Sequence, residues 1–124
     1  MEYKNLTFGE FIIAKRKEKD MSARQFAFAV GITPEYMCEI EKGKKSALSE
    51  NYVNGIIRVL NLTNGELDLF YDLLGIAQKT VSADLPEYIM EHELVRAAIR
   101  TAKKNNVPDE KWERFIKDII RKDE

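Results

Sequence analysis

The side chains that most often carry catalysis or bind metals are sparse in this chain. It has one histidine, His92, which lies between two glutamates, and one cysteine, Cys38, which has no histidine near it in the sequence. A zinc site needs three or four such ligands and a nucleophilic cysteine needs a base, so neither residue is placed for these reactions. The six glycines are scattered rather than gathered in a phosphate-binding loop. The sequence therefore predicts no enzyme, no metal site and no cofactor.

The charged side chains offer a different chemistry, because lysine and arginine can neutralise the phosphates of a nucleic acid. The formal net charge is −1, but residues 1–45 hold nine basic and seven acidic residues, whereas residues 46–85 hold two basic and five acidic ones. The basic excess therefore coincides with one part of the chain, as expected of phosphate contact. The residues concerned are Lys15, Arg16, Lys17, Lys19, Arg24, Lys42, Lys44 and Lys45.

These basic residues surround two short predicted helices joined by one tight turn. Ser22 and Gln25 form a capping box, so a helix is expected to begin directly after Ser22. Gly31 ends it, because glycine adopts the left-handed conformation without a steric penalty. Thr33 then caps a second helix with Pro34 at its first position. This order is typical of a helix-turn-helix, which places its second helix in the major groove of DNA.

The apolar residues of this pair identify the faces that meet. Phe26, Val30, Met37 and Ile40 recur at helical spacing and are expected in the core. The second helix, residues 34–42, then directs its other side chains outward. These are Pro34, Glu35, Tyr36, Cys38, Glu39 and Lys42.

Helical spacing continues through the rest of the chain, without a convincing alternating strand. Capping boxes predict helices that begin after Thr7 and after Thr63, and Ser49 begins another. Gly75 is expected to end the last of these helices. Five helices can enclose one compact core, so we place a first domain at residues 1–78.

Residues 79–124 are predicted to form a small C-terminal helical extension. After a polar connector, Pro86 begins a brief helix, residues 93–105 form a longer one, and a last helix begins at Asp109. The last helix carries an apolar stripe: Trp112, Phe115, Ile116, Ile119 and Ile120. We expect the two longer helices to pair as a hairpin with this stripe in its core. The extension is too small to be stable alone, so it should pack on the first domain or on another chain.

Composition bounds the class of protein. With 44% hydrophobic and 33% charged residues, the 124-residue chain is typical of a folded domain rather than of a disordered segment. No apolar run approaches the ~20 residues that span a bilayer, and the N-terminus lacks the apolar stretch of a signal peptide. Cys38 is the only cysteine, so no intrachain disulfide is expected. A cytoplasmic location without membrane contact is expected.

Taken together, these features resemble the Cro/cI-type (Xre) family of helix-turn-helix regulators over about residues 6–76. The residues that fall where the family's pattern places them are Met21-Ser22, Ala27, Gly31 to Pro34, Tyr36, Ile40-Glu41 and Gly43-Lys44. The resemblance implies an all-α fold with a five-helix, lambda-repressor-like DNA-binding domain. It also implies a structural ion pair between Arg16 and Glu41, which ties the first helix to the recognition helix.

The same resemblance assigns roles to the outward side chains. The base-contacting positions are Pro34, Glu35, Tyr36 and Glu39. The phosphate-contacting positions are Arg24, Lys42, Lys44 and Lys45. Two departures stand out: Ala23 replaces the glutamine that often clamps phosphate in this family, and the recognition helix is acidic. Glu39 can accept a hydrogen bond from a cytosine amino group, whereas a carboxylate that faces phosphates would weaken binding.

The expected function is sequence-specific binding of double-stranded DNA by a transcriptional regulator, with repression as the expected mode. One recognition helix reads too few base pairs to find a genomic site, so a homodimer on an inverted-repeat operator is expected. Residues 79–124 are expected to contribute much of the dimer contact. The alternative is an antitoxin or protein-interaction module, whose C-terminal helices over residues 86–122 bind a partner protein. DNA binding by the isolated chain favours the first hypothesis, and co-purification with a neighbouring gene product favours the second.

Overall fold

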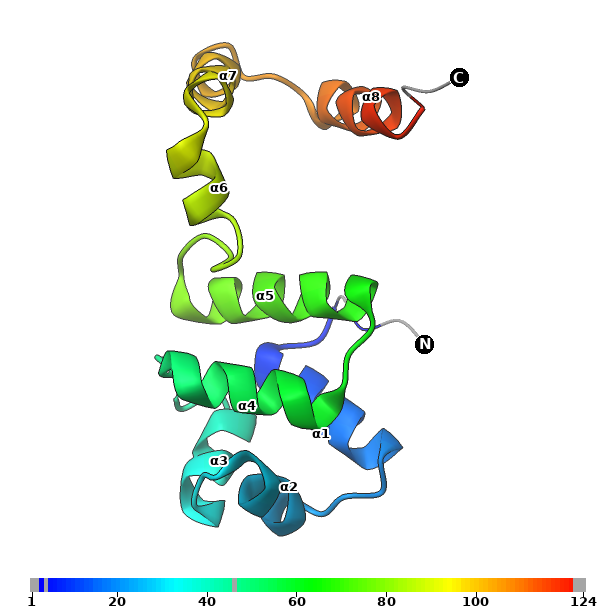
Figure 1. The fold of residues 1–124 in the computed structure, drawn as a ribbon, viewed down its shortest axis with the longest axis vertical. Coiled ribbons are helices and arrows are strands. Elements are labelled where there is room, and N and C mark those ends of the chain that lie inside the picture. Colours follow the sequence, from blue (N-terminus) through cyan, green and yellow to red (C-terminus); the bar gives the residue numbers. More distant parts are fainter. Residues whose placement is uncertain (1–2, 4, 46, 122–124) are drawn as a thin grey trace. The chain divides into compact units, whose positions relative to one another are not determined.

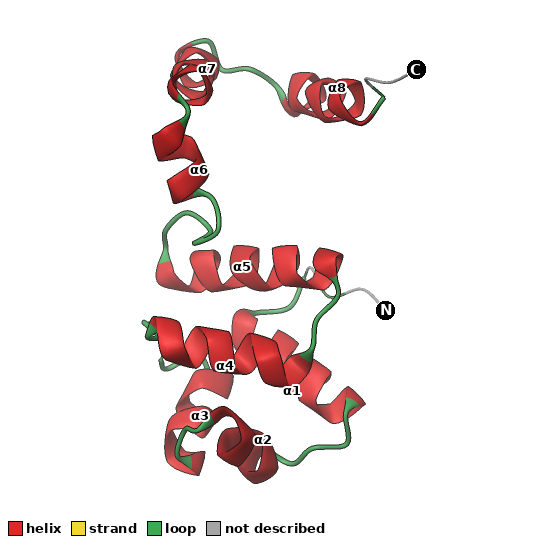
Figure 2. Ribbon diagram, viewed as in Figure 1, coloured by secondary structure: helices red, strands yellow, loops and turns green. Residues whose placement is uncertain are grey.

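The computed structural model describes residues 3, 5–45 and 47–121, and every regular element within those ranges is a helix (Figures 1 and 2). The prediction of an all-α chain is thereby confirmed. Ser46, in the loop after the predicted recognition helix, and residues 122–124, at the end of the predicted extension, lie outside the described residues. None of the described helices is long and apolar enough to cross a membrane.

Eight helices follow one another along the described chain. They are α1 (Phe8–Glu18), α2 (Ala23–Val30), α3 (Pro34–Glu41), α4 (Glu50–Leu60), α5 (Asn64–Gln78), α6 (Pro86–Glu91), α7 (Glu93–Lys104) and α8 (Asp109–Ile120). The chain divides into two compact units, Met1–Leu85 with α1 to α5 and Pro86–Glu124 with α6 to α8. The first unit thus extends to Leu85, whereas the sequence places the division after Gln78.

Side-chain caps begin the helices of the first unit where the sequence predicts them. Both reciprocal hydrogen bonds of a capping box are present at three pairs: Thr7 with Glu10, Ser22 with Gln25, and Thr63 with Glu66. Thr33 and Ser49 cap α3 and α4 by accepting from a backbone N–H in the first turn. Gly31, with a φ of 94°, ends α2 in the left-handed conformation. These caps fix where α2 and α3 begin and how sharply the chain turns between them.

The fifth helix does not end at Gly75, as the sequence predicts, but continues for one further turn. Its end is set by Lys79, whose φ is 58°, and the Thr80 N–H donates to the Gly75 carbonyl at 2.8 Å. Gly75 instead allows the backbone of the following segment to approach α5 closely. A Cβ there would lie 3.0 Å from the Thr80 oxygen and 3.1 Å from the Ser82 nitrogen. The returning chain is also held by the Ser82 hydroxyl, which donates to the Asp72 carboxylate at 2.5 Å. The first unit therefore extends beyond the end of α5.

The core of the first unit takes apolar side chains from all five helices. α2 packs against α3 and α4, and α1 packs against α3 and α5. Two glycines allow close approaches: Gly9 of α1 lies against the C-terminal end of α3, and Gly55 of α4 lies against Val30. The largest fully buried side chains are Phe11, Phe26, Phe70, Ile12, Met37, Ile40, Ile56 and Leu60. The faces of α2 and α3 that the sequence predicts to meet are therefore inside, with Val30 at their rim.

The second unit contains no buried residue in any of its three described helices. α6 packs against α7, whereas α7 and α8 diverge from the turn that joins them (Figure 1). In that turn Asn106 has a φ of 49°, and the Val107 N–H donates to the Ala102 carbonyl at 3.1 Å. The two helices thus do not close into the paired hairpin that the sequence predicts. A unit of this size buries too little apolar surface to cover both helices by itself.

Candidate nucleic-acid interface

The outer face of α3 carries the residues that the sequence assigns to base contact. Glu35 is exposed in the first turn, and Pro34 and Glu39 are half-buried beside it. The opposite face of the helix is occupied by Met37 and Ile40, which are fully buried. Because the buried face anchors α3 on the core, its outer side chains are presented by a rigid element, as sequence readout requires.

Tyr36, the fourth of these residues, is less available than the sequence predicts. Its ring meets that of Tyr52 on α4 edge to face, with centroids 5.3 Å apart. The side chain is half-buried and packs against the core. Tyr36 therefore ties the start of α3 to α4, and only the part of its ring that remains exposed can meet a ligand.

The basic residues assigned to phosphate contact are all exposed. Arg24 lies in the first turn of α2, and Lys42 directly follows α3. Lys44 and Lys45 lie in the next loop, where the Lys44 N–H donates to the Glu39 carbonyl at 2.8 Å. That bond folds the loop back on the end of α3. Two sets of cations therefore flank the outer face of α3, one from α2 and one from the loop.

Arg16 and Glu41 form an ion pair between α1 and the last residue of α3. The Arg16 Nε donates to Glu41 Oε2 at 2.7 Å and its Nη2 donates to Oε1 at 3.1 Å, so the contact is bidentate. Only 12% and 8% of the two side chains are exposed. The hydrogen bond to Glu41 raises the pKa of Arg16 further, against the opposing effect of burial. Arg16 therefore has a structural role, and its guanidinium group is not part of the exposed basic surface.

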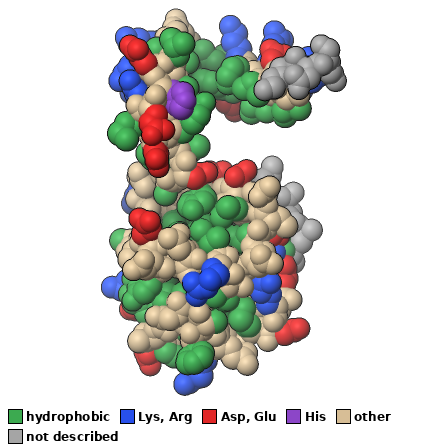
Figure 3. All heavy atoms as spheres, in the orientation of Figure 1, with side chains coloured by type: hydrophobic (Ala, Val, Ile, Leu, Met, Phe, Trp, Pro, Cys, Tyr) green, Lys and Arg blue, Asp and Glu red, His purple; other side chains and the backbone are tan. Residues whose placement is uncertain are grey.

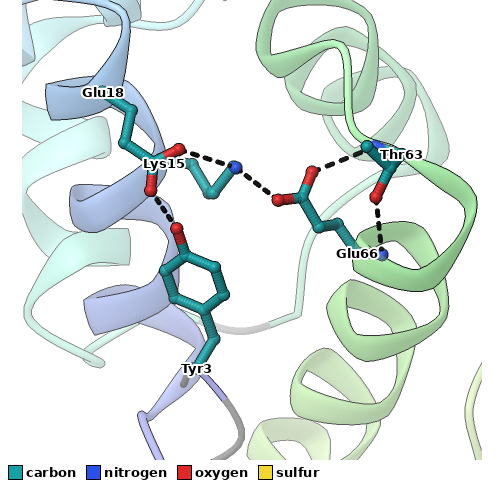
Figure 4. Close-up of polar contacts among 5 residues, drawn as sticks. All are labelled: Tyr3, Lys15, Glu18, Thr63 and Glu66. Carbon is teal, nitrogen blue, oxygen red and sulfur yellow. Dashed lines mark hydrogen bonds and ion pairs between the residues drawn. The ribbon is translucent and has the colours of Figure 1, made fainter. Parts of the chain in front are cut away.

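Lys15 also leaves the predicted basic surface, because only 7% of it is exposed. Its Nζ donates to Glu18 at 2.9 Å and to Glu66 of α5 at 2.6 Å, and the Tyr3 hydroxyl donates to Glu18 (Figure 4). Lys15 lies seven residues after Phe8, on the apolar stripe of α1. Its helical position alone therefore predicts burial. The basic surface that is exposed for contact with a ligand is therefore smaller than the count of basic residues suggests.

This polar cluster has a defined electrostatic balance. The hydrogen bond from Lys15 lowers the pKa of Glu66, and hydrogen bonds from Tyr3 and Lys15 lower that of Glu18. Burial opposes the charge on Lys15, but its hydrogen bonds to Glu66 and Glu18 outweigh burial and leave its pKa raised. A carboxylate with a lowered pKa stabilises the fold above its ordinary pKa of 4.5, and that stability is lost as the pH falls through the lowered value.

Glu66→Gln is expected to cost about 1 kcal/mol of unfolding free energy at pH 7, and this cost should shrink as the pH falls through the lowered pKa of Glu66. Glutamine keeps the oxygen that caps α5 but cannot hold the ion pair with Lys15. Below its lowered pKa the wild-type carboxylate is protonated and loses the same interaction. Urea unfolding of both proteins at pH 3, 5 and 7 measures the difference.

Glu10→Gln is the matched control for this experiment. Glu10 occupies the same position in the capping box of α1, where the Thr7 N–H donates to it at 2.9 Å, and it is exposed. If the two variants lose stability with the same pH profile, the effect belongs to the helix N-termini and the ion pair contributes nothing.

Phe28 is a surface residue that the sequence analysis missed. It lies on α2 with 88% of its surface exposed, beside a shallow hollow that Arg24, Gln25, Ile32 and Pro34 complete. The signal was present, because Phe28 is about 200° around the helix from the buried Phe26. An apolar side chain next to Arg24 adds a non-ionic contact point at the edge of the candidate interface.

The two residues considered for metal binding or catalysis have other surroundings. His92 precedes α7, stacks on Tyr88 with centroids 4.1 Å apart, and has its Nδ1 2.7 Å from the Tyr88 carbonyl oxygen. Cys38 is a half-buried free thiol on α3. Within the described ranges no group of three His, Cys, Asp or Glu side chains is placed to hold a metal ion.

Comparisons of the chain with protein-family models, with curated proteins and with solved structures gave no match.

Proposed function

We propose that this chain is a cytoplasmic transcriptional regulator that binds double-stranded DNA in a sequence-specific manner. Its proposed mode of regulation is repression. In this proposal α1 to α5 form a lambda-repressor-like helix-turn-helix domain, and α3 enters the major groove. The observation that carries the proposal is the pair α2 and α3. Both are capped, joined by the Gly31 turn and anchored on the core, and α3 keeps an outer face that is flanked by exposed cations.

The exposed side chains divide into two roles under this proposal. Arg24, Lys42, Lys44 and Lys45 neutralise phosphates on the two sides of the groove and set the position of α3. Pro34, Glu35 and the exposed edge of Tyr36 approach the base edges from the first turn of α3. Glu39, one turn later, accepts a hydrogen bond from a cytosine amino group.

The acidic face of α3 gives this proposal a specific energetic consequence. A glutamate that meets a cytosine amino group gains a hydrogen bond, whereas the same carboxylate near a phosphate or near the acceptor atoms of guanine is repelled. Glu35 and Glu39 would therefore weaken binding to unrelated DNA more than binding to the operator. Because one recognition helix reads only a few base pairs, the proposed operator is an inverted repeat with half-sites about 34 Å apart.

The test is selection of bound sequences from random double-stranded DNA by the full chain, followed by titration at several salt concentrations. We expect one preferred sequence, and binding to it that weakens as salt rises. In Lys44→Ala/Lys45→Ala, affinity for specific and unrelated DNA should fall alike, and the slope of log K against log salt should flatten by about 0.9 for each lost contact.

Lys103→Ala/Lys104→Ala is the matched control, because it removes an exposed basic pair from the end of α7. This variant should keep the wild-type slope. A wild-type protein without preference for any sequence at low salt contradicts the proposal. An unchanged slope in Lys44→Ala/Lys45→Ala shows that these two lysines do not contact phosphate.

A protein-interaction module of the antitoxin type is the second candidate function. The observation that favours it is the exposed apolar stripe of α8, since large exposed apolar patches mark interaction surfaces. In that case the chain would co-purify at a fixed ratio with a second gene product from its own genome and would bind DNA poorly without it.

A further inference from the structure

The diverging helices of the second unit enclose an open apolar groove. Its volume is about 520 Å³. The apolar residues that line it include Val95, Ile99, Ala102, Val107, Trp112 and Phe115. Further large apolar side chains lie on α8 beyond the groove: Ile116, Ile119 and Ile120, all more than half exposed. We call these three residues the α8 ridge. The space-filling view shows hydrophobic side chains gathered along α8 (Figure 3).

The apolar stripe of α8 includes more residues than line the groove. Viewed along the helix, Phe115 and Ile120 lie about 140° apart, with Trp112, Ile116 and Ile119 between them. Phe115, at one edge of this arc, and Trp112, near its middle, line the groove, and Ile119 lies between them in angle but further along the helix. Ile116 and Ile120 extend the stripe to the other edge. The same helix thus lines the groove of its own copy and carries exposed apolar residues that could fill the groove of a second copy. A surface that carries both a feature and its complement suits association by two-fold symmetry.

The exposed apolar area matches what a dimer requires. Leu94, Ile99, Trp112, Phe115 and the ridge are between 37% and 83% exposed. Their combined exposure equals about four fully exposed large side chains, or on the order of 600–800 Å² per protomer. A standard protein interface buries about 800 Å² on each partner. Isolated monomers rarely expose a continuous apolar patch of this size.

Charge favours contact between unlike helices. α7 carries Arg96, Arg100, Lys103 and Lys104 against Glu93, a balance of +3. α8 carries four acidic and three basic residues, a balance of −1. Contact of α7 with the α7 of a second copy would oppose two strongly basic helices, whereas contact of α7 with the α8 of that copy brings opposite signs together.

The described residues of the first unit form no apolar surface of comparable extent. Among its described residues, the large apolar side chains classed as exposed are Phe28, Ile76, Val81 and Leu85, which come from three different segments. Isolated exposed apolar residues of this kind are normal on a folded domain. A second copy of the same unit, by contrast, supplies an apolar surface of equal extent.

We propose that two copies of this chain associate through their second units, with the α8 ridge of each copy seated in the groove of the other. The four helices, α7 and α8 from each copy, then surround one shared apolar core on a two-fold axis. This association does not rest on DNA binding, and it would also explain why the three described helices of the second unit contain no buried residue.

Sedimentation equilibrium of the full chain between about 1 and 200 μM tests the proposal. The wild type should have twice the monomer mass of 14.4 kDa at the upper concentrations. Ile116→Glu/Ile120→Glu should shift the protein to monomer and raise the dissociation constant at least 100-fold. Phe28→Glu, which places the same charge on an exposed apolar site of the first unit, should leave the dimer intact.

Trp112 provides a second measurement, because it is the only tryptophan and lines the groove. Dilution of the wild type should shift its emission to longer wavelength at the concentration where the mass halves, while circular dichroism stays helical. A wild-type monomer at 200 μM overturns the proposal, and so does a dimer that survives in Ile116→Glu/Ile120→Glu. Emission from a buried Trp112 in a monomeric Ile116→Glu/Ile120→Glu protein also overturns it, since the groove would then be filled from within one chain.

Discussion

Replacing Arg16 by methionine is expected to lower the unfolding free energy by about 3–5 kcal/mol, the largest loss from any single polar contact in the first unit. Methionine fills much of the same space but leaves the Glu41 carboxylate in place with only 8% of its side chain exposed. Glu41 is also the last residue of α3, where the helix dipole disfavours a negative charge. Without Arg16, nothing on α1 offsets either cost. Urea unfolding at pH 7 measures the loss.

The double variant Arg16→Met/Glu41→Leu separates the ion pair from packing. Because it removes both charges together, it should recover most of the stability that Arg16→Met loses. Lys17→Met, a neighbouring change at an exposed position, should have little effect. A loss below about 1 kcal/mol in Arg16→Met would mean that water reaches Glu41 and that the pair does not hold α1 to α3.

Gly9→Ala is expected to destabilise the first unit by about 3 kcal/mol or more, although it adds only one methyl group. A Cβ at this position would lie 2.8 Å from the carbonyl carbon of Glu41 and 2.9 Å from the Ile40 oxygen, and closer still to the Glu41 oxygen. All three atoms belong to the backbone at the end of α3, so no side chain can rotate away. The helices must separate, which also stretches the ion pair between Arg16 and Glu41. Thermal unfolding followed by circular dichroism measures the loss.

Gly65→Ala is the control for this substitution. Gly65 is also helical, but a Cβ there would meet nothing within 4 Å. Alanine should therefore stabilise the protein by roughly 0.5 kcal/mol through helix propensity alone. Equal melting temperatures for the two variants would show that α1 can move away from α3 without cost.

The beginnings of the first five helices could be predicted from the sequence because each depends on residues close together in the chain. The capping boxes at Thr7, Ser22 and Thr63 need only two side chains three residues apart. The end of α2 at Gly31 was equally local. The ion pair between Arg16 and Glu41, 25 residues apart, was expected from a family resemblance rather than from spacing.

Features that depend on distant parts of the chain were harder to predict. Gly75 has the residue type that ends helices, but its small size is needed for the returning segment at Thr80 and Ser82. The opening between α7 and α8 likewise depends on how the turn at Asn106 aims the second helix. A hydrophobic pattern predicts neither that the segment after α5 packs back on that helix nor the direction that α8 takes after the turn.

The candidate interface shows the same division. Exposure of Arg24, Lys44 and Lys45 follows from their positions at a helix start and in a loop. Lys15 was misplaced because its charge was given more weight than its position on the apolar stripe of α1. Tyr36 was assigned wholly to the surface, because its contact with Tyr52 joins residues of different helices and has no local signal.

Because the two units are consecutive in the chain, the first unit can fold during synthesis before the second is complete. Once α5 has left the ribosome, every helix that builds the core of the first unit is available, while α8, which follows it along the chain after α6 and α7, is still inside the ribosome. Helical domains fold in about microseconds to milliseconds. The first core therefore closes before α8 leaves the ribosome, so the exposed apolar stripe of α8 does not compete with that core for partners.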